Sequence, residues 1–160
     1  DGACSLTIAG TMHNLFDGTD RDAILARLAA LDPVNARQWG RMTLPQMLAH
    51  CSVAFQFPLG ERTRKQSLLG KLVSPFVRRT VLGRDPLKKN GPTGPDFIIT
   101  GEPDFEVERQ RLMAYVLRFC AEGRGGVNNR GHVFFGPMTG EEWGRLMYKH
   151  LDHHLRQFSA

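Results

Sequence analysis

Apolar residues recur at helical spacing in several stretches of the chain, and they form the most regular pattern in the sequence. Ile24, Leu28 and Leu31, for example, fall three and four residues apart, which places them on one face of a helix. Five helices are predicted in this way: Thr19–Leu31, Thr43–Phe57, Ser67–Val81, Asp104–Glu122 and Thr139–Phe158. Strand signals are few and short, at Ser5–Ala9 and at residues 97–99. The pattern therefore predicts an all-α fold, a four-helix bundle with a short extra helix and loops.

The starts of three predicted helices carry a threonine followed three residues later by an acidic or amide side chain. This is the capping-box pattern, in which the two side chains bond to the backbone amides of the first turn. The pairs are Thr19 with Asp22, Thr43 with Gln46, and Thr139 with Glu142. Asp104 is the predicted N-cap of the fourth helix, whose buried side is predicted to hold Val107, Leu112, Val116 and Phe119.

The chain of 160 residues fits one domain, 1–160, with an N-terminal strap at 1–18 and a basic segment and loop at 61–103. Lysine and arginine dominate residues 62–89, where they alternate with apolar residues, and Pro75 is predicted to break or kink the helix there. Such a pattern can contact nucleic acid or an anionic membrane surface. No recognised nucleic-acid motif accompanies it, so we expect no specific nucleic-acid partner. The apolar side of this helix is instead predicted to pack in the core or in a dimer contact.

Composition adds three expectations. The net charge of +5 favours solubility and attracts anions without defining a partner. The three cysteines, Cys4, Cys51 and Cys120, form no Cys-x-x-Cys pair, which favours free thiols and a cytoplasmic location. No run of about 18 apolar residues occurs, so we expect no transmembrane segment. The first residue is aspartate rather than methionine, which indicates a trimmed or processed chain.

The six histidines carry the strongest chemical signal. His150 and His154 lie four residues apart, which places their side chains about 40° apart around a helix and roughly 6 Å apart along it. Two imidazoles at this spacing can share one metal ion. They fall on the apolar side of the last predicted helix, and His50 falls on the apolar side of the second predicted helix. Three neutral imidazoles from two helices predict a metal site with an open coordination position.

Two further histidines are candidates for acid–base work beside such a site. His153 falls toward the polar side of the last helix, so we expect it at the rim and outside the set of metal ligands. His132 precedes the last helix in an apolar segment bounded by glycine and proline. Both are predicted as catalytic candidates, and the alternative for His132 is an ordinary loop histidine.

Two segments resemble the DinB/YfiT-like superfamily. Residues 39–51 (WGRMTLPQMLAHC) are similar to its second-helix motif, and residues 132–139 (HVFFGPMT) with 142–158 (EWGRLMYKHLDHHLRQF) are similar to its last helix. The resemblance covers most of residues 19–158. It implies a four-helix bundle, often a homodimer, and a three-histidine site for zinc, nickel or iron carried here by His50, His150 and His154.

The resemblance also suggests an activity, because characterised members of that superfamily include thiol S-transferases and a thiol-dependent isomerase. We therefore expect a small-molecule substrate, with a low-molecular-weight thiol as one candidate. A metal-dependent hydrolase and a non-catalytic metal-binding or ligand-binding scaffold are the alternatives. The residues themselves do not select among these three, since a metal ion with an open position supports thiol transfer and hydrolysis alike.

Overall fold

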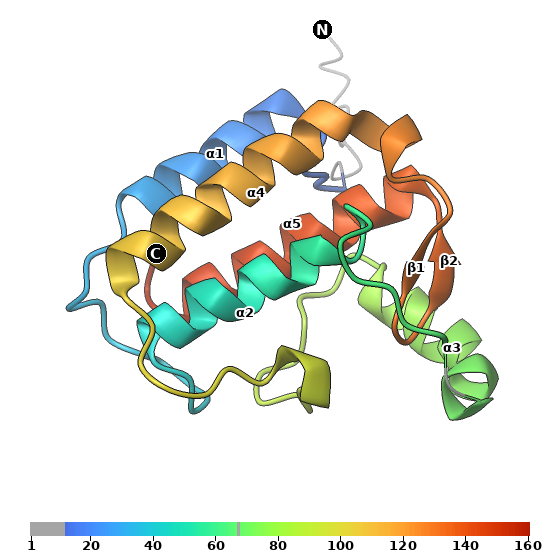
Figure 1. The fold of residues 1–160 in the computed structure, drawn as a ribbon, viewed down its shortest axis with the longest axis horizontal. Coiled ribbons are helices and arrows are strands. Elements are labelled where there is room, and N and C mark those ends of the chain that lie inside the picture. Colours follow the sequence, from blue (N-terminus) through green and yellow to red (C-terminus); the bar gives the residue numbers. More distant parts are fainter. Residues whose placement is uncertain (1–11, 67) are drawn as a thin grey trace, which may run out of the picture.

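The structure is a computed structural model, and it describes residues 12–66 and 68–160 (Figure 1). The prediction for Ser5–Ala9, like most of the N-terminal strap, lies outside the described residues. The elements follow in the order α1 (Gly18–Ala29), α2 (Leu44–Gln56), α3 (Leu68–Val81), the short 3-10 helix η1 (Pro95–Phe97), α4 (Phe105–Gly126), β1 (Arg130–His132), β2 (Gly136–Met138) and α5 (Gly140–Gln157). The chain is therefore mostly helical, as predicted, with one small sheet.

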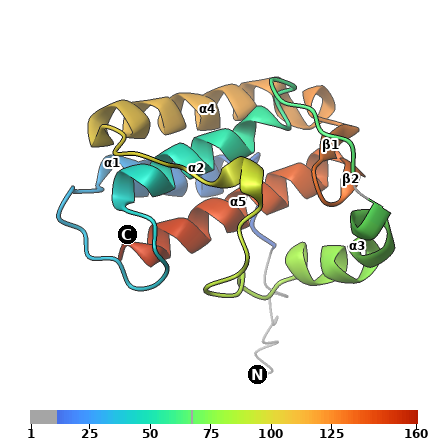
Figure 2. The same cartoon turned by 60° about the horizontal axis from the view of Figure 1, so that its bottom comes forward.

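Helices α1, α2, α4 and α5 pack against one another and enclose the hydrophobic core (Figures 1 and 2). α2 lies against both α4 and α5, so that residues about 100 positions apart in the chain become neighbours. The largest fully buried side chains come from these four helices and from the segments that adjoin them: Leu15, Ile24, Leu28, Met47, Leu48, Phe55, Leu112, Phe119, Met138, Trp143, Met147 and Phe158. Burial of these surfaces is the main force that fixes the helix arrangement.

Two of the three predicted capping boxes are present. Thr43 and Thr139 accept hydrogen bonds from the amides three residues on, and the side chains of Gln46 and Glu142 return a bond to the cap. The prediction for Thr19 is wrong, because α1 begins at Gly18 and its N-cap is Asp17.

The buried side of α4 differs from the prediction at one position. Leu112, Val116 and Phe119 are fully buried as expected, but Val107 is 53% exposed. Val107 lies in the first turn, on the opposite side of the helix from the other three. The first-turn residue on the buried side is Glu108. Asp104 caps the helix as predicted, accepting a hydrogen bond from the amide of Val107.

The small sheet was not predicted. β1 and β2 pair in an antiparallel hairpin in which Arg130 faces Met138 and His132 faces Gly136. Strands of three residues are too short to show an alternating pattern, which explains why the sequence gives no signal. The hairpin leads directly into α5 and buries Phe135 and Met138 against the core.

Helix α3 departs most from expectation. It runs through Pro75 to Val81 and stands apart from the four packed helices (Figure 2). Its large apolar side chains were predicted to pack in a core or a dimer contact, yet Leu68, Leu72 and Phe76 face solvent. These three side chains are therefore not in the core, whereas Val81 at the end of the helix packs against it, and the dimer contact stays a prediction. Within the described residues, no helix is both long and apolar enough to cross a membrane.

Candidate metal centre

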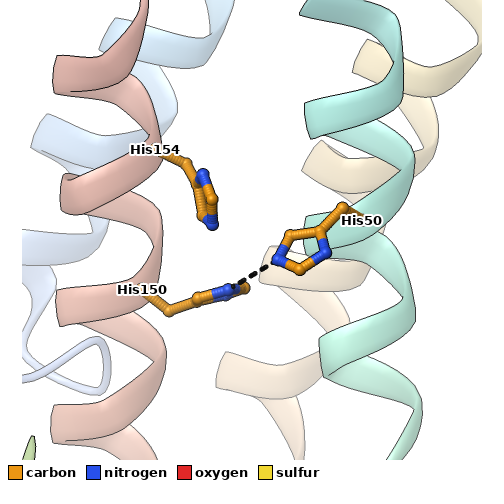
Figure 3. Close-up of side chains that lie close together, drawn as sticks. All are labelled: His50, His150 and His154. Carbon is orange, nitrogen blue, oxygen red and sulfur yellow. Dashed lines mark hydrogen bonds between the residues drawn. The ribbon is translucent and has the colours of Figure 1, made fainter. Parts of the chain in front are cut away.

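Three histidines from two helices point into one space between α2 and α5 (Figure 3). His50 comes from α2, and His150 and His154 come from successive turns of α5. The Nε2 atoms of His50 and His150 are 3.1 Å apart. One ligand nitrogen from each of the three residues lies within 4.8 Å of the other two. The structure therefore brings together the three residues that the sequence analysis selected.

This spacing fits a metal ion after a small contraction. Three atoms separated by no more than 4.8 Å lie at most about 2.8 Å from a common point, whereas a Zn–N bond is about 2.0–2.1 Å. Side-chain shifts of less than about 1 Å would bring the nitrogens to bonding distance. His50 and His154 are buried and His150 is partly buried, so the centre is shielded from bulk solvent.

The orientation of His50 is fixed from the side away from the cluster. Its Nδ1 lies 2.9 Å from the carbonyl oxygen of Phe97 in η1. A carbonyl can only accept, so Nδ1 carries the proton and Nε2 presents its lone pair to the cluster. The Phe97 ring lies 5.9 Å from the His50 ring and 5.4 Å from the ring of Phe57. Phe97 therefore both orients the ligand and covers it with apolar surface.

His154 is oriented by a chain of two hydrogen bonds. Gln157 donates from Nε2 to the carbonyl oxygen of Trp39 at 2.7 Å, which turns its Oε1 toward Nδ1 of His154 at 2.8 Å. Because that oxygen can only accept, His154 also holds its proton on Nδ1 and presents Nε2. Such partners of ligand imidazoles set the tautomer and tune metal affinity. Neither Gln157 nor Phe97 was predicted from the sequence; Gln157 stands at i+3 from His154, a spacing that could have indicated it.

In the part of the chain that the structure describes, the ring of His150 lacks an orienting hydrogen bond of the kind that His50 and His154 have. The Nδ1 atom of His150 is buried and has no hydrogen-bond partner within the described residues. Its Nε2 lies against the lone pair of His50 at 3.1 Å, so the two nitrogens must share either a proton or a cation. A bound cation would satisfy both lone pairs at once. The donor set and this close approach of two nitrogens therefore fit a transition-metal ion.

Burial keeps all three imidazoles neutral. Desolvation is the largest cause that lowers the pKa of His50 and of His150, and it lowers the pKa of His154 to about 3. The neighbouring histidines add to this effect at His150 and His154, since a second positive charge nearby would be repelled. Neutral imidazole is the form that binds metal, so the protein presents its ligands in the competent state at neutral pH.

His153 lies outside the histidine cluster, in agreement with its predicted position at the rim. It is half-buried, its ring is 5.4 Å from that of Trp39, and it lines a cavity of about 360 Å³ together with Tyr148 and Asp152. His150 and His154 do not line this cavity, which lies along another face of α5. The catalytic role of His153 stays a prediction.

His132 has a clear structural role. Its Nδ1 accepts hydrogen bonds from the amides of Phe134 at 3.1 Å and Phe135 at 3.2 Å, which closes the turn of the hairpin. Its ring stacks on Phe135 with centroids 4.6 Å apart, and burial lowers its pKa to about 4. His132 is near enough to His150 to help lower the pKa of that residue. Its predicted catalytic role stays a prediction.

The fold and the site define a mostly helical protein with a cluster of three histidines that can hold a metal ion. The chain belongs to the family described as Protein of unknown function (DUF1569), which matches residues 12–160. No match was found among curated proteins or among solved structures.

Proposed function

We propose that this protein is a metal-dependent enzyme that works through His50, His150 and His154. The observation that carries the proposal is the convergence of three neutral imidazoles, two of which have their ring protons held on the far side by Phe97 and Gln157. A structural zinc site would use four protein ligands, whereas three ligands leave a position for a reactant. The proposed ion is zinc, nickel or iron, all of which accept imidazole nitrogen.

The ligand set determines what chemistry the ion would supply. With three neutral ligands the divalent ion keeps its positive charge, which favours an anionic partner in the open position, such as a thiolate or a hydroxide. The buried surroundings of His50 and His154 strengthen this preference, because charges interact more strongly where water is excluded. The residues thus favour activation of a weak acid, a thiol or water, at neutral pH.

We favour thiol transfer, with a low-molecular-weight thiol as substrate, because of the resemblance to the DinB/YfiT-like superfamily. The same resemblance supports a four-helix bundle of that type and a homodimer as parts of the proposal. The cysteines, which form no Cys-x-x-Cys pair, support a cytoplasmic location. Two alternatives to thiol transfer remain. One is hydrolysis by the same ion, and the other is a non-catalytic metal-binding scaffold.

The test begins with metal analysis of protein purified without a histidine tag, followed by cobalt substitution. Addition of small thiols to the cobalt form should produce a sulfur-to-metal charge-transfer band, and a thiol-dependent transfer assay should show turnover. Hydrolysis of an ester or amide panel without a thiol band would favour the hydrolase. A protein that binds no metal, or whose metal binding survives His154→Ala, would rule out the proposed centre.

A further inference from the structure

Helix α3 turns three large apolar side chains away from the rest of the protein. Gly70 and Ser74 are buried, whereas Leu68, Leu72 and Phe76, which follow at intervals of four residues, are 84%, 73% and 80% exposed. These three side chains form a stripe along the outer face of the helix, here called the apolar stripe. An exposed row of large apolar side chains is unfavourable in water and marks an interaction surface.

The stripe is embedded in positive charge. Residues 62–84 contain seven cations and no acidic residue: Arg62, Arg64, Lys65, Lys71, Arg78, Arg79 and Arg84. Two of them are paired: Arg64 with Asp96, and Arg78 with Glu142 at 2.5 Å and 2.9 Å. Lys71 and Arg79 are exposed and have no ion-pair or hydrogen-bond partner among the described residues. Lys71 and Arg79 are therefore available to an external anion.

The helix is held at a defined angle, because its C-terminal end is anchored. Lys149 of α5 donates from Nζ to the carbonyl oxygens of Val81 and Gly83 at 2.5 Å and 2.8 Å, and Arg78 reaches Glu142 at the start of α5. These contacts satisfy the carbonyl of the last helical residue and one carbonyl just beyond it, and they leave the outer face of the helix unobstructed. α3 consequently projects beside the packed helices as a preformed element (Figures 1 and 2).

Charge and size narrow the choice of partner. A second copy docking through the same face would bring Lys71 and Arg79 of one chain, which have no partner among the described residues, close to those of the other, and like charges oppose such a contact. A stable protein interface also takes about 20–30 residues from each side, far more than one stripe supplies. An amphipathic helix with Leu and Phe on one side and basic residues around them is the pattern that lies in the headgroup region of an anionic bilayer.

We propose that α3 docks this protein onto anionic membrane surfaces, with Leu68, Leu72 and Phe76 inserted among the lipids and with Lys71 and Arg79 on the headgroups. The interaction is peripheral and reversible, because a single short helix adds modest apolar area and its electrostatic part is screened by salt. This inference uses no residue of the histidine cluster and does not depend on the proposed enzyme activity.

The experiment is co-sedimentation of the whole 160-residue chain with vesicles of phosphatidylcholine alone and of phosphatidylcholine with 30% phosphatidylserine. We expect binding to the anionic vesicles, weakened at high salt. Lys71→Glu with Arg79→Glu should weaken binding by at least about 25-fold, since each basic residue near the surface contributes about fivefold. Leu72→Ser with Phe76→Ser should abolish retention, and these exposed positions should tolerate the change without loss of fold.

Matched controls lie elsewhere on the surface. Val34 is 86% exposed and Arg41 is exposed. Val34→Ser and Arg41→Glu therefore make the same two types of substitution away from α3, and they should leave vesicle binding unchanged. Equal loss in the controls would show a general charge effect and overturn the proposal. So would equal binding to both kinds of vesicle.

Two other results would replace the membrane with another partner. Absence of vesicle binding, together with a dimer that Leu72→Ser and Phe76→Ser convert to monomer, would assign the stripe to self-association. Absence of vesicle binding with tight, salt-dependent binding to duplex DNA that Arg79→Ala removes would assign the segment to nucleic acid.

Discussion

Gln157 offers the sharpest test of the metal centre, because it orients a ligand without touching the ion. Its side chain is 2% exposed and bridges Nδ1 of His154 to the carbonyl oxygen of Trp39. Replacement by alanine removes both hydrogen bonds and frees the His154 ring to rotate or change tautomer. Loss of such a partner of a ligand histidine lowers metal affinity by about 10–100-fold.

The same substitution affects stability through a separate contact. The partly buried Trp39 carbonyl loses its donor from Gln157, and a polar group left unpaired away from water costs up to about 1–3 kcal/mol. Gln157→Glu separates the two effects. Its carboxylate can still accept from Nδ1–H of His154, but it cannot donate to Trp39. We therefore expect Gln157→Glu to keep near-normal zinc affinity while the free energy of unfolding falls as in Gln157→Ala.

The assay is competition for zinc against a chromophoric chelator, with urea unfolding of the apo-protein as the measure of stability. Gln56→Ala is a matched control, since Gln56 also donates from a partly buried side chain, at 3.2 Å to the Tyr115 hydroxyl, but not to the histidine cluster. Unchanged zinc affinity in Gln157→Ala would refute the reasoning. Equal loss of affinity in Gln157→Glu would do so as well, because it would show that the Trp39 contact rather than the His154 contact matters.

Three further predictions follow from single positions. His150→Ala should abolish metal binding, measured by elemental analysis, whereas His153→Ala should leave metal content near that of the unsubstituted protein. Gly140→Ala should lower the free energy of unfolding by about 1–3 kcal/mol or more, because the added Cβ would lie 2.0 Å from the carbonyl oxygen of Arg124. Cys120 should resist alkylation at pH 7.5 in the native protein, since burial raises its pKa to about 11 and keeps it in the thiol form; mass mapping would detect labelling.

Each of these has its own control. Equal metal loss in the His150 and His153 variants would show that the helical phase of α5 is wrong. Gly125→Ala places a Cβ in open space and should change stability little, so a large effect there would discredit the steric argument for Gly140. Rapid labelling of native Cys120 at pH 7.5 would mean that its side chain is more exposed than the structure shows.

The sequence by itself determined the features that depend on near neighbours. Hydrophobic spacing located α2, α4 and α5 to within a few residues, and the capping boxes at Thr43 and Thr139 marked two helix starts because capping uses only the first turn. The shared side of His150 and His154 also followed from the helical period alone, as did the rim position of His153.

Only the tertiary structure decided which distant residues meet. The approach of His50 to His150 depends on how α2 packs against α5, and the partners Phe97 and Trp39 come from segments with no local signal for such a role. At α3, tertiary packing gave a different result from the one that the sequence pattern predicted. Its amphipathic spacing predicted burial of the apolar side, but periodicity shows only that a helix has an apolar side, and the anchoring contacts made by Lys149 and Arg78 determine that this side faces outward.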